Sequence, residues 1–157
     1  GGRGAAGVGD VCSSADVARL AGEAAKFFGE GSPCDVLVTS AGIGRFGTVE
    51  EISEADFDAT FQVRCARWGD SAASAAARDG LTAGAPQVNV KGSWLWAREL
   101  VPVFKAQGHG QLLFVSSVAG LRTFARCSAY GASKWAVQGI AGSIREECKG
   151  SGVKVAT

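Results

Sequence analysis

Residues 111–117 read Gln-Leu-Leu-Phe-Val-Ser-Ser, an apolar run that ends in two serines. Its length predicts a strand buried inside a sheet. A long helix is predicted over 128–149. Small and apolar residues recur along one side of it, at Ala132, Ala136, Ile140 and Ile144. Because 153–155 then opens another strand, the segment predicts a parallel strand–helix–strand crossover and so an α/β fold.

The same alternation runs through the rest of the chain. Residues 35–41 form a second apolar run, which predicts a strand buried on both faces. Further helices are predicted from a cap at Ser13 or Ser14 to Phe28, over 53–61, and from Trp94 to about Gly108 with a kink at Pro102. We expect the first of them to cover a face of the sheet. Alternating strands and helices predict a doubly wound, Rossmann-like parallel sheet.

The composition excludes several classes of protein. In 157 residues, 46% are apolar and the net charge is +1, which favours a soluble globular domain over a nucleic-acid-binding or membrane-surface protein. No apolar run is long enough to span a bilayer. Five widely spaced cysteines without a C-x-x-C pair indicate reduced thiols and no metal site. We expect an intracellular, cytoplasmic protein, with an organelle as the alternative.

The stretch 63–87 interrupts the alternation of strands and helices. It is rich in Ala, Gly, Ser and Arg and has no sustained apolar period, so we predict a disordered insert within a single partial domain spanning 1–157. Deleting it would join Gln62 to Val88. One hypothesis is an in-frame retained intron, because every valine codon starts with GT and a glutamine codon can end in AG. The alternative is a native surface loop.

Two side chains at the start of the long helix point to proton-transfer chemistry. Tyr130, the only tyrosine, comes four residues before Lys134, so the phenol and the ammonium share a helix face. A tyrosine is ordinarily a poor acid or base at neutral pH because its pKa is about 10, and a nearby cation lowers that value. Ser117 ends the preceding strand, at the edge where parallel sheets bind ligands.

The segments Ser117-Val-Ala-Gly and Ser128-Ala-Tyr130-Gly-Ala-Ser-Lys134 resemble the serine and Y-x-x-x-K motifs of the short-chain dehydrogenases/reductases. The spacing is also similar, since the serine lies thirteen positions before the tyrosine and Asn89 lies 28 positions before the serine, where that family has its asparagine. Thr39-Ser-Ala-Gly42 resembles the family's N-N-A-G segment, with Thr and Ser in place of both asparagines. Asp10-Val11 resembles a pair whose aspartate bonds adenine.

The resemblance implies an NAD(P)-dependent oxidoreductase for a small alcohol or carbonyl compound. Tyr130 would exchange a proton with the substrate oxygen and Ser117 would hold that oxygen. Lys134 would bind the nicotinamide ribose and tune the phenol, while Asn89 would hold a proton-relaying water. The other residues implied at the cofactor are Asp10, Val11, Ser40, Ala41 and Gly42. NAD and NADP both stay open. The complete protein is expected to be a homodimer or homotetramer, with the helices at 89–107 and 128–149 forming the dimer face.

The family's opening turn, T-G-x-x-x-G-x-G, has no counterpart in the chain. Gly2-Arg-Gly-Ala-Ala-Gly7 fits G-x-G-x-x-G in letters only, since no predicted strand precedes it and no helix opens from it. The chain also has no methionine and stops at Thr157, within a predicted strand. We therefore expect a domain truncated at both ends, with impaired cofactor binding.

Two other functions compete with the oxidoreductase reading. The first is a non-catalytic dimerisation or binding module derived from the same family, which the missing glycine turn favours. The second is a serine hydrolase, which is disfavoured because Gly131-Ala-Ser-Lys-Trp135 lacks the last glycine of G-x-S-x-G and His109 is the only histidine.

Overall fold

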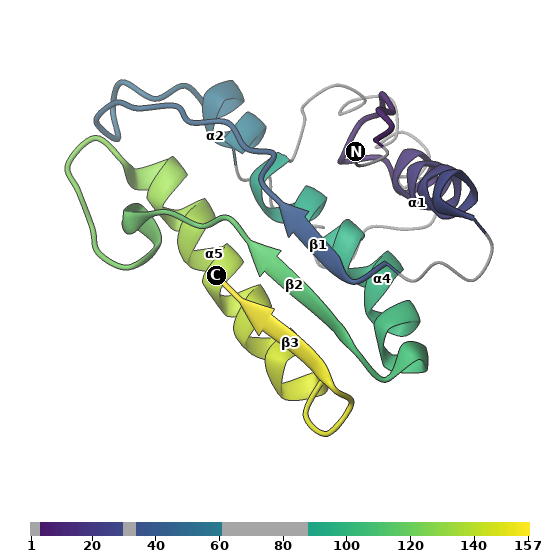
Figure 1. Cartoon of the computed structure of the whole chain (residues 1–157). Helices are drawn as coiled ribbons and strands as arrows, with labels where there is room; N and C mark the ends of the chain where they lie inside the picture. The colour runs from purple at the N-terminus through teal and green to yellow at the C-terminus, as the bar shows by residue number, and fades with distance from the viewer. Residues whose placement is uncertain (1–3, 30–33, 61–87) are drawn as a thin grey trace, which may run out of the picture.

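The computed structural model describes residues 4–29, 34–60 and 88–157 (Figure 1). Its elements are α1 (Ser14–Phe28), β1 (Val36–Thr39), α2 (Glu54–Thr60), the π-helix η1 (Val88–Gly92), α4 (Ser93–Gln107), β2 (Gly110–Phe114), the 3-10 helix η2 (Val118–Gly120), α5 (Ser128–Glu147) and β3 (Val153–Ala156). The predicted insert at 63–87 lies outside the described residues, as does the Gly2–Gly7 motif's first glycine.

The described strands form one parallel sheet in the order β1-β2-β3. Val38 of β1 lies opposite Leu113 of β2, and Leu113 lies opposite Ala156 of β3. The connection from β2 to β3 runs through α5, which is the predicted parallel crossover. The α/β class with a parallel sheet is therefore confirmed.

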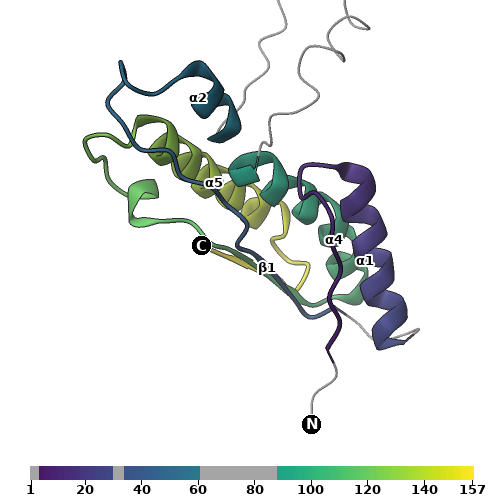
Figure 2. The same ribbon diagram turned by 90° about the horizontal axis from the view of Figure 1, so that it is seen from above.

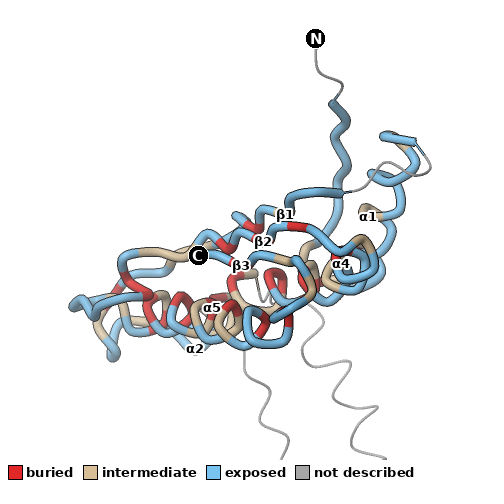
Figure 3. The backbone as a smooth tube through the Cα atoms, turned by 60° about the horizontal axis from the view of Figure 1, so that its bottom comes forward, coloured by how far each residue is buried: buried red, intermediate tan, exposed pale blue. Residues whose placement is uncertain are grey.

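The described long helices lie on one face of this sheet. Figure 2 shows α5 and α4 against the strands and α1 beyond α4. Burial alternates along β2: Leu112 and Phe114 are buried, whereas Leu113 is 40% exposed on the other face (Figure 3). Val36 and Val38 of β1 are exposed as well, so the prediction of a strand buried on both faces is wrong for the described part of the chain. An apolar run shows that a strand can be covered, but not on which faces.

The core fills the space between the sheet, α4 and α5. It consists of Ala97, Phe104, Leu112, Phe114, Val137, Ala141, Ile144, Cys148 and Val155. The predicted apolar side of α5 is partly wrong, because Ala132 is exposed while Ile144 is buried. The helix is rotated from that expectation because two polar residues, Ser133 and Lys134, face inward. A pattern of apolar residues along a helix does not reveal polar side chains that are buried because they belong to a functional site.

Polar contacts fix the start of α1, and a glycine ends it. The Ser13 hydroxyl accepts a hydrogen bond from the Asp16 amide at 3.2 Å, so Ser13 is the cap of the two predicted serines. The helix ends at Gly29, whose φ is +102°. α1 lies on the same side of the sheet as α4 and packs mainly on that helix (Figure 2), whereas the prediction had it cover a face of the sheet.

The turns that close α4 and α5 pack against each other. Gly108 ends α4 in the left-handed region with φ +75°, and Gly152 precedes β3 with φ +77°. A β-carbon added to Gly152 would collide with the Gly108 carbonyl oxygen. The predicted helix through Pro102 and its end near Gly108 are confirmed.

Across residues 4–29, 34–60 and 88–157, no helix is both long and apolar enough to cross a membrane. The same ranges hold no group of three or more His, Cys, Asp or Glu side chains placed to bind a metal ion. Among the cysteines that the structure describes, no disulfide forms.

Candidate active site

A cavity of about 290 Å³ opens beyond the carboxyl ends of β1 and β2. Three segments line it: the loop after β1, the end of β2 and the first turns of α5. Ser40 and Gly42 come from the loop, Ser116 from the end of β2, and Tyr130 and Lys134 from α5. These segments meet because the carboxyl ends of neighbouring parallel strands share one edge. The predicted tyrosine and lysine therefore line one cavity at the predicted edge.

Lys134 is a buried cation beside the Tyr130 ring. Its Nζ lies 5.8 Å from the ring centroid and donates a hydrogen bond to the Val115 carbonyl oxygen at 2.9 Å. The residue is only 5% exposed, and burial lowers the pKa of its amine below the ordinary value. The extended end of β2 thus holds the ammonium next to the phenol ring.

Asn89 ties the loop after β1 to α5. Its Oδ1 accepts a hydrogen bond from the Ile43 amide at 2.7 Å, and its Nδ2 donates to the Ile43 carbonyl at 2.8 Å and to Ser133 Oγ at 3.0 Å. Ser133 Oγ in turn donates to the Tyr130 carbonyl oxygen at 2.7 Å. The asparagine is 1% exposed, so these bonds satisfy a buried amide and fix the loop relative to the tyrosine's helix.

Gly42 keeps space open between two of these side chains. A β-carbon at this position would lie 3.1 Å from Asn89 Oδ1 and 3.6 Å from Lys134 Nζ. Any larger residue would therefore press on the asparagine that holds the loop and fill part of the cavity beside the lysine. The absence of a side chain at Gly42 leaves open space in the cavity beside Asn89 and Lys134, which we call the Gly42 cradle.

Ser117 is not among the residues that line the cavity, whereas its neighbour Ser116 is. The Ser117 hydroxyl caps η2 by accepting a hydrogen bond from the Ala119 amide at 3.1 Å. The Ser116 hydroxyl donates to the Lys134 carbonyl oxygen at 3.3 Å. The structure thus brings Tyr130 and Lys134 together at the cavity and links Asn89 to the Tyr130 backbone through Ser133, while Ser117 lies next to Ser116 in the chain and caps η2.

Some of the residues expected at the cofactor lie along a second cavity, also of about 290 Å³, next to β1. Val11, Ser40 and Ala41 line it. Asp10 does not: its Oδ1 accepts a hydrogen bond from the Cys12 amide at 2.8 Å and shapes the turn before α1. The buried Thr39 hydroxyl, which lines the cavity, has no hydrogen-bond partner among the described residues.

Sequence reasoning missed Phe46, whose ring contacts Tyr130. The ring centroids are 5.2 Å apart and the rings are inclined by 53°. The signal in the sequence was the pair Gly42 and Gly44 followed by an aromatic residue, because glycines let a ring lie close to the backbone. Ser133 was also missed, and nothing in the pattern distinguished it from other helix serines.

Comparison with known proteins decides the family. The short chain dehydrogenase family model matches residues 71–157, which is more than half of the 157-residue chain. The chain belongs to the short-chain dehydrogenase family. Asn89, Ser117, Tyr130 and Lys134 all lie in the matched region.

Relatives of this chain match it over nearly its whole length. The sepiapterin reductase of Chlorobaculum tepidum is 27% identical over 146 residues, which cover 93% of this chain and 48% of that protein. The 2,3-dihydro-2,3-dihydroxybenzoate dehydrogenase of Escherichia coli is 30% identical over 145 residues, covering 92% of this chain and 48% of that one. The chain spans about half the length of the curated relatives it matches.

A solved structure shares the fold of this chain. The structure of ElxO with NADP bound superposes with a TM-score of 0.71 at 23% identity, covering 94% of this chain and 49% of that one. The predicted membership of the short-chain dehydrogenases/reductases, and the Rossmann-like architecture that it implied, are therefore confirmed.

Proposed function

We propose that this chain carries the catalytic part of an NAD(P)-dependent oxidoreductase that interconverts a small alcohol and its carbonyl compound. One observation carries the proposal: Tyr130 and the buried Lys134 line a single cavity at the carboxyl edge of the sheet. A phenol beside a cation that is held by a backbone carbonyl is suited to proton exchange with a substrate oxygen.

The residues present fit the nicotinamide end of such a cofactor. The Gly42 cradle leaves room beside Lys134 Nζ, and the Ser40 hydroxyl lines the same cavity. An ammonium and a hydroxyl are the groups that hold ribose hydroxyls. When bound, the nicotinamide supplies or accepts the hydride, and the protein contributes orientation and electrostatics. Neither NAD nor NADP is preferred by these residues.

Tyr130, Lys134 and Ser117 would then act on the substrate oxygen. In the reductive direction the Tyr130 hydroxyl gives its proton to the substrate oxygen, and the Lys134 ammonium stabilises the phenolate that remains. The Ser117 hydroxyl accepts a bond from the Ala119 amide, which leaves its O–H proton free to donate to the same substrate oxygen.

Asn89 would act through its backbone, because its side-chain amide already makes hydrogen bonds within the protein. Oδ1 and both hydrogens of Nδ2 are engaged with Ile43 and Ser133. Its backbone carbonyl accepts from the Ser93 hydroxyl at 3.1 Å and has a second lone pair for a water. We therefore propose that the proton-relaying water binds the backbone of Asn89, and not its side chain.

The proposal extends to assembly of the complete protein as a homodimer or homotetramer. Trp94 of α4 and Trp135 of α5 are both large and exposed, on helices whose other sides are buried against the sheet. Exposed aromatic side chains on adjacent helices support an interface on this side of the molecule.

The test is a titration of the full chain with NADH and with NADPH, followed by nicotinamide fluorescence, and a turnover assay on carbonyl compounds with the Tyr130→Phe variant as control. We expect the nicotinamide nucleotide to bind saturably to the natural chain and to the Tyr130→Phe variant. Turnover should fall by at least about 100-fold in the variant, because only the phenol hydroxyl is removed. Absence of binding to either nucleotide would contradict the proposal and favour a non-catalytic module.

A further inference from the structure

Phe46 occupies an unusual place for a large apolar side chain. It lies in the loop after β1, lines the cavity that holds Tyr130 and Lys134, and is 60% exposed. Its contact with the Tyr130 ring leaves most of its surface uncovered. A ligand whose oxygen lies at Tyr130 would therefore have its body next to this ring.

The backbone around Phe46 is built to hold the ring in this position. A β-carbon on Gly44 would lie 2.8 Å from Phe46 Cε2 and 3.4 Å from Tyr130 Cδ2, so only glycine allows the ring to lie over the backbone here. The Gly47 amide donates to the Arg126 carbonyl at 3.0 Å, and Gly47 forms a parallel bridge with Cys127.

An ion pair adds to this attachment. Arg126 Nη1 lies 2.9 Å from Glu51 Oε2, which fixes the loop a second time to the segment just before α5. Arg126 also has φ +64°, a conformation that non-glycine residues rarely adopt. The loop after β1 and the start of α5 thus hold the two rings as one unit.

The cavity combines apolar walls with the polar side chains of Ser40, Ser116, Tyr130 and Lys134. Ile43, Phe46 and Val115 are its apolar walls, and no carboxylate is among its described lining residues. The Arg45 guanidinium next to Phe46 is engaged with Asp56 at 3.0 Å. A flat aromatic body fits this wall, because aromatic rings attract one another in offset or inclined arrangements.

We propose that Phe46 is the substrate-contact residue that selects aromatic carbonyl compounds, by packing its ring against theirs while their oxygen lies at Tyr130. This inference rests on the proposed oxidoreductase function. It adds the substrate class and assigns the selecting contact to one side chain.

The single tyrosine of the chain makes a direct test possible. The full chain labelled with 3-fluorotyrosine gives one ¹⁹F resonance, from Tyr130, which reports binding without turnover. The probes are acetophenone and cyclohexyl methyl ketone, which have similar size and differ in the aromatic ring. We expect both to shift the resonance saturably, with acetophenone binding about five- to tenfold more tightly.

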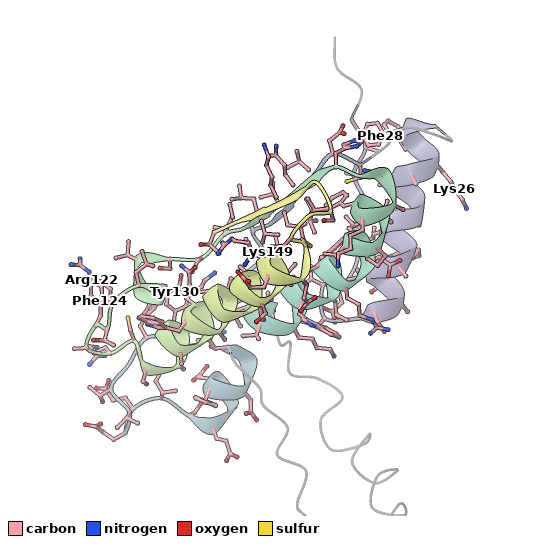
Figure 4. All side chains as sticks on the ribbon, turned by 90° about the horizontal axis from the view of Figure 1, so that it is seen from below. Lys26, Phe28, Arg122, Phe124, Tyr130 and Lys149 are labelled. Atoms are coloured by element: carbon pink, nitrogen blue, oxygen red, sulfur yellow. The ribbon has the colours of Figure 1, made fainter. Side chains whose placement is uncertain are left out.

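Phe46→Leu removes the ring and keeps an apolar side chain. We expect it to weaken acetophenone binding about five- to tenfold and to leave cyclohexyl methyl ketone nearly unchanged, so that the preference disappears. Phe28→Leu is the matched control, since Phe28 is 50% exposed and lies at the opposite end of the molecule from Tyr130 (Figure 4).

The outcomes separate this inference from the proposed function. A preference unchanged in Phe46→Leu, or no saturable shift with acetophenone, would overturn the role of Phe46 even if Tyr130-dependent turnover occurs. A Phe46-dependent preference without nicotinamide turnover would support the aromatic contact and contradict the oxidoreductase function instead.

Discussion

Lys134 is a charged side chain in a nearly closed environment, where its amine donates to the Val115 carbonyl. Because burial lowers its pKa, the folded protein releases this proton at a lower pH than the unfolded chain does, whose lysines titrate near pH 10.4. Between these two values the unfolded state binds more protons. This group therefore makes the free energy of unfolding rise with pH in that window.

We expect the difference in unfolding free energy between the natural chain and Lys134→Met to grow in favour of the natural chain as the pH rises from the lowered pKa of Lys134 toward the ordinary lysine value of about 10.4. Urea denaturation at several pH values measures it. Lys26→Met, which removes an exposed ammonium in the last turn of α1, is the control for the loss of one lysine. A curve for Lys134→Met that runs parallel to that of the natural chain would contradict the assignment.

At the scale of the elements, the contact between the turns after α4 and α5 determines how β3 joins the sheet. Gly150 and Gly152 lie in one turn with φ +76° and +77°, but only Gly152 has a neighbour, the Gly108 carbonyl oxygen, in the place of a β-carbon. Gly150→Ala should lower the free energy of unfolding by about 1 to 2 kcal/mol, because alanine is disfavoured in the left-handed region. Gly152→Ala should cost about 1 to 3 kcal/mol more, because the two turns must separate.

Urea unfolding of both variants measures this difference, and Gly150→Ala serves as the internal control because its backbone angles are nearly the same. Equal losses of stability would mean that the turns can separate without cost. A larger loss of unfolding free energy in Gly152→Ala than in Gly150→Ala would show that the contact between the turns holds β3 in register with β2.

The elements also show what can be predicted from sequence and what cannot. The pairing of Tyr130 with Lys134 was predictable because the spacing along a helix determines it. The bonds of Asn89 to Ile43 were not, since 46 positions separate them and the loop must fold before they meet. The strands were predictable in kind, but their one-sided burial depends on which helices are present to cover them.

At the scale of the whole molecule, the open face of the sheet is an exposed apolar surface of the described residues. We define it by Val36, Val38, Leu113 and Val115, all exposed on β1 and β2 or directly after β2. A contiguous apolar patch of this kind promotes association in water.

We expect Val38→Thr combined with Leu113→Thr to lower self-association of the full chain, measured by light scattering, and to change the free energy of unfolding by less than about 1 kcal/mol. Threonine has the β-branched shape that strands favour, which Val38 already has, and it adds a hydroxyl at both positions. Val49→Thr, at a residue 80% exposed in the loop before α2, is the control and should leave scattering unchanged. Unchanged scattering in the double variant would show that association does not involve the open face.

The central position of β2 has a further consequence for internal motion. Its backbone hydrogen-bonds to β1 on one edge and to β3 on the other, and Leu112 and Phe114 anchor it to the core. Each edge strand can open by breaking bonds on one side, whereas β2 can open only if the entire sheet comes apart. Its amide protons should exchange with deuterated water most slowly, at the rate of global unfolding, while the loop that carries Phe46 exchanges through small local openings.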